Sequence, residues 1–364
     1  MHARLQELAA NPALAPFVTA PLREGGRFGN PWPHPPMARF AELLRWQRER
    51  PRRKPGAVRD LAALADPLGG LHALPDTGSA DAPATRITWL GHASFQIESA
   101  GVRLLVDPVL GRAGGVVGRV VPAPLGIERL PRPDAVLLTH GHHDHADGAS
   151  LRALIRRFGP ELRFVVPQGM RATLPRGARA VTELSWWEQT EVDRARVTLV
   201  PAQHWHRRGV ADHNRALWGG YVVQAAHAVY HSGDTGFFGG FAAIGAAFPD
   251  LDAAILPVGA WAPRWFMAAQ HMDPQGSVAA FADLGARHFI AMHWGTFDLS
   301  DERVDAGPDE LVEALRARAE RHDDAPSRQR VHVPRAGASL ALVGHGGTSR
   351  VIADRDAMHA LERW

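Results

Sequence analysis

The sequence predicts an α/β or α+β fold in which a large part of the chain is sheet. Two observations support this class. Short apolar runs bounded by Gly, Pro, Asn and Asp recur along most of the chain and are typical of strands. A few longer segments with helical spacing lie between them, and such alternation is typical of sheets covered by helices. The composition, with 45% hydrophobic and 22% charged residues, is that of an ordinary globular protein.

Residues 1–84 are rich in Pro, Gly and Arg, and we expect them to form an N-terminal extension that packs on the main domain. The prolines of residues 30–36 exclude a regular helix there. Residues 37–50 have helical spacing, with Phe40, Leu43, Leu44 and Trp46 on one side. The pattern predicts a helix docked on the main body. A role at a membrane surface or at the substrate entrance is the alternative.

The main domain is expected over residues 85–345, with a C-terminal tail at 346–364. A strand hairpin is predicted from 87–97 and 102–107, followed by a Gly/Pro-rich loop at 111–133. Further strands are predicted at 134–138, 163–166, 197–201, 221–224, 229–231, 253–257 and 288–292. Helices are predicted at 149–158, 274–284 and 308–321.

Composition narrows the functional classes. The chain has no Cys, which excludes disulfides and thiolate ligands, so any metal must be held by nitrogen and oxygen. A net charge of +3 with scattered Arg argues against a nucleic-acid partner. No apolar run is long enough to span a membrane, and the first residues lack the pattern of a signal peptide. The cytoplasm is the expected location, with peripheral contact to a membrane left open.

The most informative motif is Thr139-His140-Gly141-His142-His143-Asp144-His145, which directly follows the predicted strand at 134–138. His140 and His142 are two residues apart and would lean the same way. Asp144 and His145 follow in the turn and could serve a second centre. Imidazole and carboxylate are ligands that zinc, iron and manganese accept. The ordered pattern after a strand therefore predicts a metal site rather than a His-rich surface loop.

Three later strands also end in a candidate ligand, namely His204, Asp234 and His293. Each alone has an ordinary explanation, because a His after a strand is often structural and an Asp in Ser-Gly-Asp-Thr-Gly is often a turn former. Together with the first motif they supply seven side chains, which is enough for two divalent ions that share one carboxylate. Zinc is the expected metal, and iron and manganese are alternatives.

Further motifs occur along the chain, namely Asn30-Pro31-Trp32-Pro33, Trp89-Leu90-Gly91-His92-Ala93, Pro201-Ala202-Gln203-His204-Trp205, Gly233-Asp234-Thr235-Gly236, Gln270-His271-Met272-Asp273-Pro274 and His293-Trp294-Gly295-Thr296-Phe297. The order of ligands resembles the metallo-β-lactamase superfamily, and within it these motifs resemble the N-acyl-phosphatidylethanolamine-hydrolysing phospholipase D family. The resemblance implies a four-layer αββα sandwich. It also implies that His140, His142 and His204 hold one metal, that Asp144, His145 and His293 hold the other, and that Asp234 bridges them.

The family's reaction would be attack of a metal-bridging hydroxide on the phosphorus of N-acyl-phosphatidylethanolamine, giving phosphatidic acid and N-acylethanolamine. Asp144 would be a ligand that also orients the hydroxide, and His271 would contact the substrate or the leaving oxygen. His92 and Asp107 are expected to support ligands by hydrogen bonds. An aromatic segment is expected to contact the acyl chains, through Trp261, Trp265, Phe266 and Met267.

Other activities on the same metal core remain open. A phospho-sugar lactonase would have no use for the N-terminal extension, and a tRNA-processing nuclease would need a basic strip. An iron redox protein is a third alternative, although a complete ligand set with a bridging carboxylate favours hydrolysis. The expected partner is a phospholipid or another phosphodiester, and a homodimer is left open.

Overall fold

Two mixed β-sheets form the centre of the computed structural model, which describes residues 1–36, 40–49, 84–209, 211–321, 330–344, 349–353 and 358. The eight-stranded sheet has the order β17-β16-β3-β4-β5-β6-β7-β8. Its strands are β3 (Ala84–Gly91), β4 (Ser94–Ser99), β5 (Val102–Val106), β6 (Ala135–Leu137), β7 (Arg163–Pro167), β8 (Val181–Leu184), β16 (Ser339–Val343) and β17 (Arg350–Ala353).

The seven-stranded sheet has the order β15-β14-β13-β12-β11-β10-β9. Its strands are β9 (Gln189–Val192), β10 (Ala195–Val200), β11 (Gly220–Gln224), β12 (Ala228–His231), β13 (Ala253–Pro257), β14 (His288–Met292) and β15 (Val331–His332). The inner faces of the two sheets share one large apolar core. Tyr221 also links the sheets, because its hydroxyl donates to the carbonyls of Leu138 and Val165, 3.0 and 3.1 Å away.

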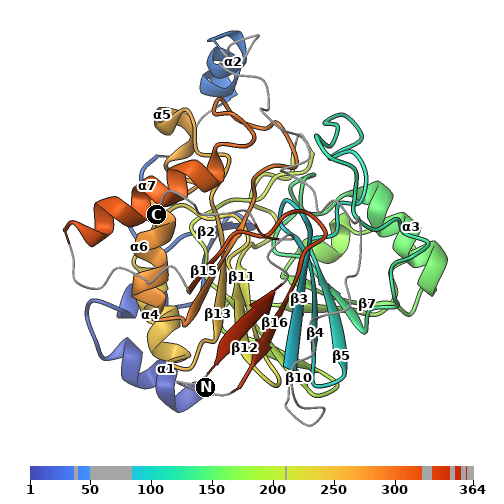
Figure 1. The fold of residues 1–364 in the computed structure, drawn as a ribbon, viewed down its shortest axis with the longest axis horizontal. Coiled ribbons are helices and arrows are strands. Elements are labelled where there is room, and N and C mark those ends of the chain that lie inside the picture. The colour runs from blue at the N-terminus through green and yellow to red at the C-terminus, as the bar shows by residue number, and fades with distance from the viewer. Residues whose placement is uncertain are drawn as a thin grey trace.

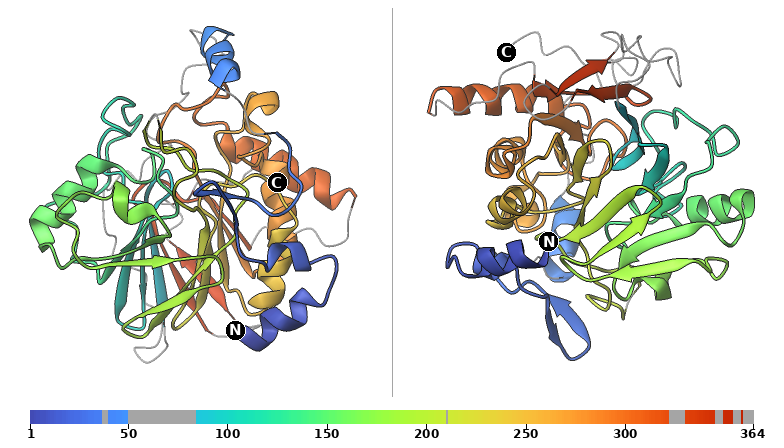
Figure 2. Two further views of the ribbon diagram at one scale, coloured as in Figure 1. Left: turned by 180° about the vertical axis from the view of Figure 1, so that it is seen from behind. Right: turned by 90° about the horizontal axis from the view of Figure 1, so that it is seen from below.

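Helices cover both outer faces, which completes four layers (Figures 1 and 2). On the eight-stranded sheet, α3 (Gly148–Phe158) buries Leu151 and Leu154, and the Asp147 side chain caps it by accepting from Ser150 N. The other sheet is covered by α4 (Gly240–Ala247), α6 (Pro274–Leu284) and α7 (Gly307–Ala319). The αββα sandwich and the helices expected at 149–158 and 274–284 are therefore confirmed.

The strands that precede the candidate ligands end at the same edge of the sandwich. In the seven-stranded sheet, β12, β13 and β14 run parallel, and β10 shares their direction because both β10 and β12 are antiparallel to β11. In the other sheet, β5, β6 and β7 are parallel. Parallel strands bring their carboxyl ends together, so residues that follow β6, β10, β12 and β14 can meet.

The described part of the N-terminal region packs on this sandwich. Helix α1 (His2–Ala9) lies against α4, and the hairpin of β1 (Leu22–Glu24) and β2 (Arg27–Gly29) follows the short 3₁₀ turn η1 (Ala15–Phe17). Trp32 is 4% exposed and stacks between Trp186 and Phe238, at 5.3 and 5.0 Å between ring centroids. The helix expected at 37–50 is α2 (Phe40–Glu49), and its Trp46 stacks on Phe266 of α5 (Arg264–Met267) at 5.2 Å.

Several elements differ from the sequence-based expectation. The strand expected at 87–97 is two strands, β3 and β4, because the chain turns at His92, whose φ is +57°. Within the segment 346–364 expected as a tail, β17 pairs antiparallel with β16 and so belongs to the sheet. Strands β8, β9, β15 and β16 and helix α4 had not been expected. Residues 51–83 of the predicted extension lie outside the described residues. Among the described helices, none is long and apolar enough to cross a bilayer.

Candidate metal centre

One group of converging side chains comes from the ends of β6 and β10 and from the Asp that follows β12. The ring nitrogen Nδ1 of His142 lies 2.9 Å from Nε2 of His140 and 3.1 Å from Nε2 of His204. Asp234 Oδ2 lies 3.9 Å from Nε2 of both His140 and His204. These four donor atoms all lie within 4.8 Å of one another, as the ligands of one ion would.

A second group lies beside the first. His293 Nε2 and His145 Nε2 are 2.9 and 3.2 Å from Asp234 Oδ1, and Asp144 Oδ2 is 3.9 Å from His145 Nε2. Donor atoms of Asp144, His145, His293 and His92 lie within 4.8 Å of one another. The seven side chains expected as metal ligands are therefore all brought together.

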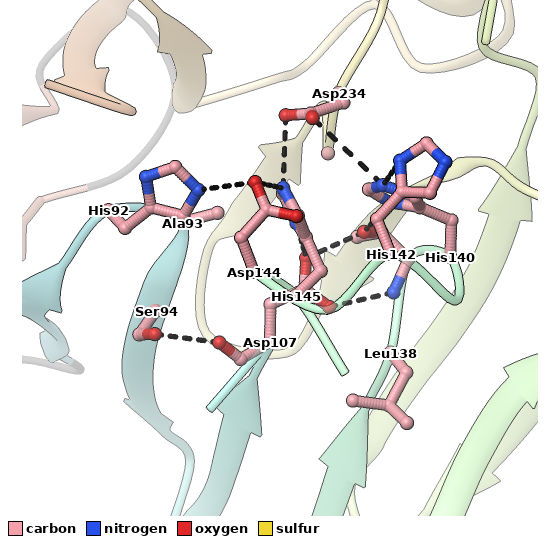
Figure 3. A network of polar contacts seen from close by, with 12 residues as sticks. His92, Ala93, Ser94, Asp107, Leu138, His140, His142, Asp144, His145 and Asp234 are labelled. Atoms are coloured by element: carbon pink, nitrogen blue, oxygen red, sulfur yellow. Dashed lines mark hydrogen bonds and ion pairs between the residues drawn. The ribbon is translucent and has the colours of Figure 1, made fainter. Parts of the chain in front are cut away.

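Asp234 stands between the two groups and turns one oxygen to each (Figure 3). Its Oδ1 faces His145 and His293, whereas its Oδ2 faces His140 and His204. A carboxylate placed in this way can bind two ions at once, so the buried clusters are consistent with a dinuclear metal site.

The outward nitrogens of the imidazoles are held by hydrogen bonds. Asp107 Oδ2 accepts from Nδ1 of His145 at 2.7 Å, and Asp107 also accepts from the backbone N–H and the hydroxyl of Thr139. His204 Nδ1 donates to the carbonyl of Gln270 at 3.0 Å. Such partners fix the ring orientation and direct Nε2 of His145 and His204 inward, towards the place of an ion. The geometry at Asp107 fits the supporting role expected for it.

His92 lies in the turn between β3 and β4, with its Nε2 at 3.1 Å from Asp144 Oδ2 and its ring 3.8 Å from that of His293. Burial and the neighbouring His293 lower the pKa of His92 to about 3. A neutral His92 can donate to Asp144 and fix that carboxylate. His92, Asp107 and His293 all have positive φ, and such left-handed backbone at non-glycine residues is typical of functional sites.

The electrostatics of the site fit a bound cation. Burial and neighbouring histidines lower the pKa of His140 and His204 well below the usual value, so both rings are neutral and can act as ligands. At His145, burial acts to lower the pKa, but Asp234, Asp107 and Asp144 outweigh it and raise that pKa well above its usual value. The buried carboxylates of Asp107, Asp144 and Asp234 thus make the centre of the site favourable for a positive charge.

Unpaired buried atoms point to the same conclusion. Within the described residues, His145 Nε2 and His293 Nε2 lie 3.2 and 2.9 Å from Asp234 Oδ1, but none of these three buried atoms makes a hydrogen bond of acceptable geometry. Buried polar atoms without partners are rare in proteins because they cost free energy. The donor set of imidazole and carboxylate suits zinc, iron or manganese, so the residues fit the ions that the sequence predicts.

The open side of the centre is marked by Asp144 and His271. Their side chains are 19% and 14% exposed, whereas that of Asp234 is 1% exposed. His271 Nδ1 lies 3.8 Å from Asp234 Oδ2, so the structure places this residue at the site as expected. A substrate would therefore approach over Asp144 and His271.

The four side chains expected to contact acyl chains do not share one surface. Trp261 lines a small cavity of about 10 Å³ next to His92 and His293. Trp265 is 50% exposed. Phe266 and Met267 are buried in a cluster with Trp46 of α2. Their side chains therefore form the surface on which α2 packs, and they do not line an open groove. Trp186 and Trp187 lie in the core between the sheets.

Sequence reasoning missed the residues that support the metal-binding turn from behind. A Cβ on Gly141 would lie 2.0 Å from Cε1 of the buried His206, so only glycine fits at that position. Arg208 donates to the carbonyls of Gly141 and Ala146 and so holds both ends of the turn. The glycine within the His motif was the one signal of this close approach.

Comparisons with known proteins agree with the fold. The family model described as a β-lactamase superfamily domain matches residues 102–294, more than half of the chain. The N-acyl-phosphatidylethanolamine-hydrolyzing phospholipase D 1 of Caenorhabditis elegans is 34% identical over 65% of this chain and 71% of its own length. The mitochondrial enzyme of that name from Saccharomyces cerevisiae is 33% identical over 63% of this chain and 51% of its own length. A solved metallo hydrolase from Ignicoccus hospitalis shares the fold, with a TM-score of 0.54 at 20% identity over 71% of this chain and 98% of that one.

The fold and the paired His/Asp clusters define a metal-dependent hydrolase of the metallo-β-lactamase type. The chain belongs to the metallo-β-lactamase superfamily and, within it, to the family of the N-acyl-phosphatidylethanolamine-hydrolysing phospholipases D.

Proposed function

We propose that this protein is a phosphodiesterase that hydrolyses N-acyl-phosphatidylethanolamine-like phospholipids to phosphatidic acid and N-acylethanolamine. The observation that carries the proposal is Asp234, which turns one carboxylate oxygen to each of two buried ligand groups. The phospholipid substrate is supported by relatives with that activity in their names, at 33–34% identity.

Two divalent ions held by these residues, most simply zinc, would lower the pKa of a water molecule and stabilise charge on the attacked phosphorus. The water oxygen would form the new bond to phosphorus, and the bond to the ethanolamine oxygen would break. The leaving oxygen would take up a proton, so that the alcohol departs neutral. No nucleophilic side chain and no covalent enzyme intermediate is required.

The protein's own side chains would orient the reactants. His92 donates to Asp144 and so fixes this carboxylate at the open side of the site, where it can accept a hydrogen bond from the attacking water. His271, on the same open side, can donate to a phosphoryl oxygen or to the leaving oxygen. Both side chains are partly exposed, whereas the other carboxylate at the centre is not.

Peripheral contact with a membrane is part of the proposal. Helix α2 lies against α5, and Leu44 of α2 and Trp265 of α5 are 39% and 50% exposed. Arg45 lies over the Trp265 ring at 5.0 Å. Apolar side chains beside Arg are typical of surfaces that rest on anionic lipid, so this edge would bring the site to the substrate.

The test is to incubate the purified, zinc-loaded protein with N-acyl-phosphatidylethanolamine vesicles, other phosphodiesters and lactones, and to identify the products by mass spectrometry. We expect phosphatidic acid and N-acylethanolamine, and no products after metal removal by a chelator. Turnover of lactones alone would show that the substrate class is wrong. A product that carries a new hydroxyl group derived from molecular oxygen would indicate redox chemistry instead.

A further inference from the structure

Residues of the N-terminal region contact the loop that carries His204 on both sides of that ligand. On one side, Trp32 Nε1 donates to the side-chain oxygen of Gln203 at 3.2 Å. On the other, the backbone N–H of Phe28 donates to the carbonyl of Asn214 at 2.7 Å. Asn214 is joined in turn to His206, by its backbone N–H to the carbonyl of His206 at 2.7 Å and by its side-chain oxygen to the N–H of His206 at 3.0 Å.

Gln203 connects this contact to the orientation of the neighbouring ligand. Its side-chain amide donates to the carbonyl of Ala269 at 3.1 Å. The next carbonyl along the chain, that of Gln270, accepts from His204 Nδ1 at 3.0 Å. The Gln203 amide therefore ties the strand end that carries His204 to the segment whose carbonyl sets the direction of the His204 ring.

The space around Gln203 leaves it little freedom to move. Gln203 and Trp32 are 2% and 4% exposed. A Cβ on Gly236 would lie 2.9 Å from the Gln203 amide nitrogen and 2.8 Å from the Ala269 carbonyl. Because the amide is buried in this way, loss of the Trp32 N–H would leave the Gln203 side-chain oxygen without that donor. An unsatisfied buried oxygen costs free energy, and reorientation of the amide would reduce this cost.

We propose that Trp32 is a positioning residue for the metal centre: it holds Gln203, and through Gln203 the His204 ligand, in the geometry that binds metal. The N-terminal segment therefore contributes to metal affinity as well as to packing. This inference rests on the proposed metal centre. It adds to that centre Trp32, which lies 171 positions before its partner Gln203 in the sequence.

The test compares two substitutions in the full-length protein that each remove one buried indole N–H. Trp32→Phe removes the donor to Gln203. Trp187→Phe, the matched control, removes a donor to the carbonyl of Phe17, 3.1 Å away in the same N-terminal region. The readout is the Kd of the metal-free protein for Zn²⁺, measured by competition with a chromophoric chelator. Thermal unfolding of the metal-free proteins reports the loss of packing separately.

We expect Trp32→Phe to weaken zinc binding about 3- to 10-fold, which is less than the roughly 10- to 100-fold loss typical for a direct hydrogen-bond partner of a metal ligand, because Trp32 acts through Gln203. Trp187→Phe should leave the Kd within about 2-fold of the wild-type value, even if it lowers the melting temperature as much as Trp32→Phe does. Gln203→Met should weaken zinc binding at least as much as Trp32→Phe. The double variant should bind zinc no more weakly than Gln203→Met alone, because Trp32 acts through Gln203.

Equal affinity losses in Trp32→Phe and Trp187→Phe would overturn the inference, since they would show a general effect of N-terminal packing. Additive losses in the double variant would overturn it too, because Trp32 would then act by another route. A wild-type protein that binds no zinc would instead contradict the metal centre itself, so the two failures are distinguishable.

Discussion

At the scale of single residues, Asp234 is the side chain on which the two-ion arrangement depends. Its oxygens face different ligand groups, so its replacement should affect both. We predict that Asp234→Asn lowers the occupancy of both ions and that activity falls by orders of magnitude. Elemental analysis of the purified protein should find about two ions per chain in the wild type. Loss of a single ion with activity retained would contradict a shared carboxylate.

Gly141 tests how closely the metal-binding turn packs on its support. We predict that Gly141→Ala lowers the free energy of unfolding by about 1–3 kcal/mol and reduces zinc content, because the added methyl overlaps the His206 ring. Chemical denaturation and elemental analysis measure the two effects. Gly111→Ala is the control, since a Cβ there meets nothing within 4 Å.

A second substitution at His206 checks the cause. If the overlap is responsible, His206→Ala in the Gly141→Ala background should restore part of the zinc content by making room for the methyl. No restoration would mean that Gly141 is required for another reason.

At the scale of elements, substitutions at the edge formed by α2 and α5 can separate the binding of membrane-borne substrate from the hydrolysis step. We predict that Leu44→Ser combined with Trp265→Ser slows the cleavage of vesicle-borne substrate by about 10-fold or more, because full burial of an apolar side chain contributes about 1.5–3 kcal/mol and about half of each of these side chains is open to lipid. Cleavage of a short, soluble phosphodiester should be unchanged. Leu22→Ser, on the exposed strand β1, is the control. Equal loss of both activities with a lower melting temperature would show that the edge is only packing.

Elements with strong local patterns could be predicted from the sequence, and others could not. Strand β13 is a continuous apolar run, and β14 is apolar after its first residue, His288. Helix α6 has Asp273 and Pro274 at its start and Gly285 after its end. By contrast, β8 and β9 are short and mostly polar. Helix α4 is apolar nearly all round, so it shows no helical periodicity.

The candidate site shows the same limit. Its ligands could be predicted because each follows a strand within a short motif. The contact between Trp32 and Gln203 could not, because it joins residues 171 positions apart and leaves no local pattern. The docking of Trp46 on Phe266 was missed for the same reason, and Phe266 was therefore expected to meet substrate.

At the scale of the whole molecule, buried neutral histidines outside the metal centre make stability depend on pH. His332 Nε2 lies 3.2 Å from Nδ1 of His288, whose Nε2 meets the carbonyl of Ser349. Burial and the neighbouring His288 lower the pKa of His332 to about 3. In the unfolded chain this residue takes up a proton near pH 6.5. Its contribution to stability is therefore complete above pH 6.5 and is lost as the pH falls towards 3.

We predict that stability falls between pH 6.5 and 4, with this residue contributing up to about 1.4 kcal/mol per pH unit. In His332→Gln the decrease in the free energy of unfolding on acidification should be smaller by that amount, because glutamine does not titrate. Denaturant titrations at pH 7 and pH 4.5 measure the difference, and His34→Gln, at an exposed position, is the control. An equal acid sensitivity in wild type and His332→Gln would contradict the assignment.

The central claim, that water attacks phosphorus at a two-metal centre, is tested most directly by hydrolysis of N-acyl-phosphatidylethanolamine in H₂¹⁸O. The zinc-loaded protein should place one ¹⁸O atom in phosphatidic acid and none in N-acylethanolamine, because the bond from phosphorus to the ethanolamine oxygen is the one that breaks. Label in N-acylethanolamine or in a released fatty acid, read by mass spectrometry, would contradict the account.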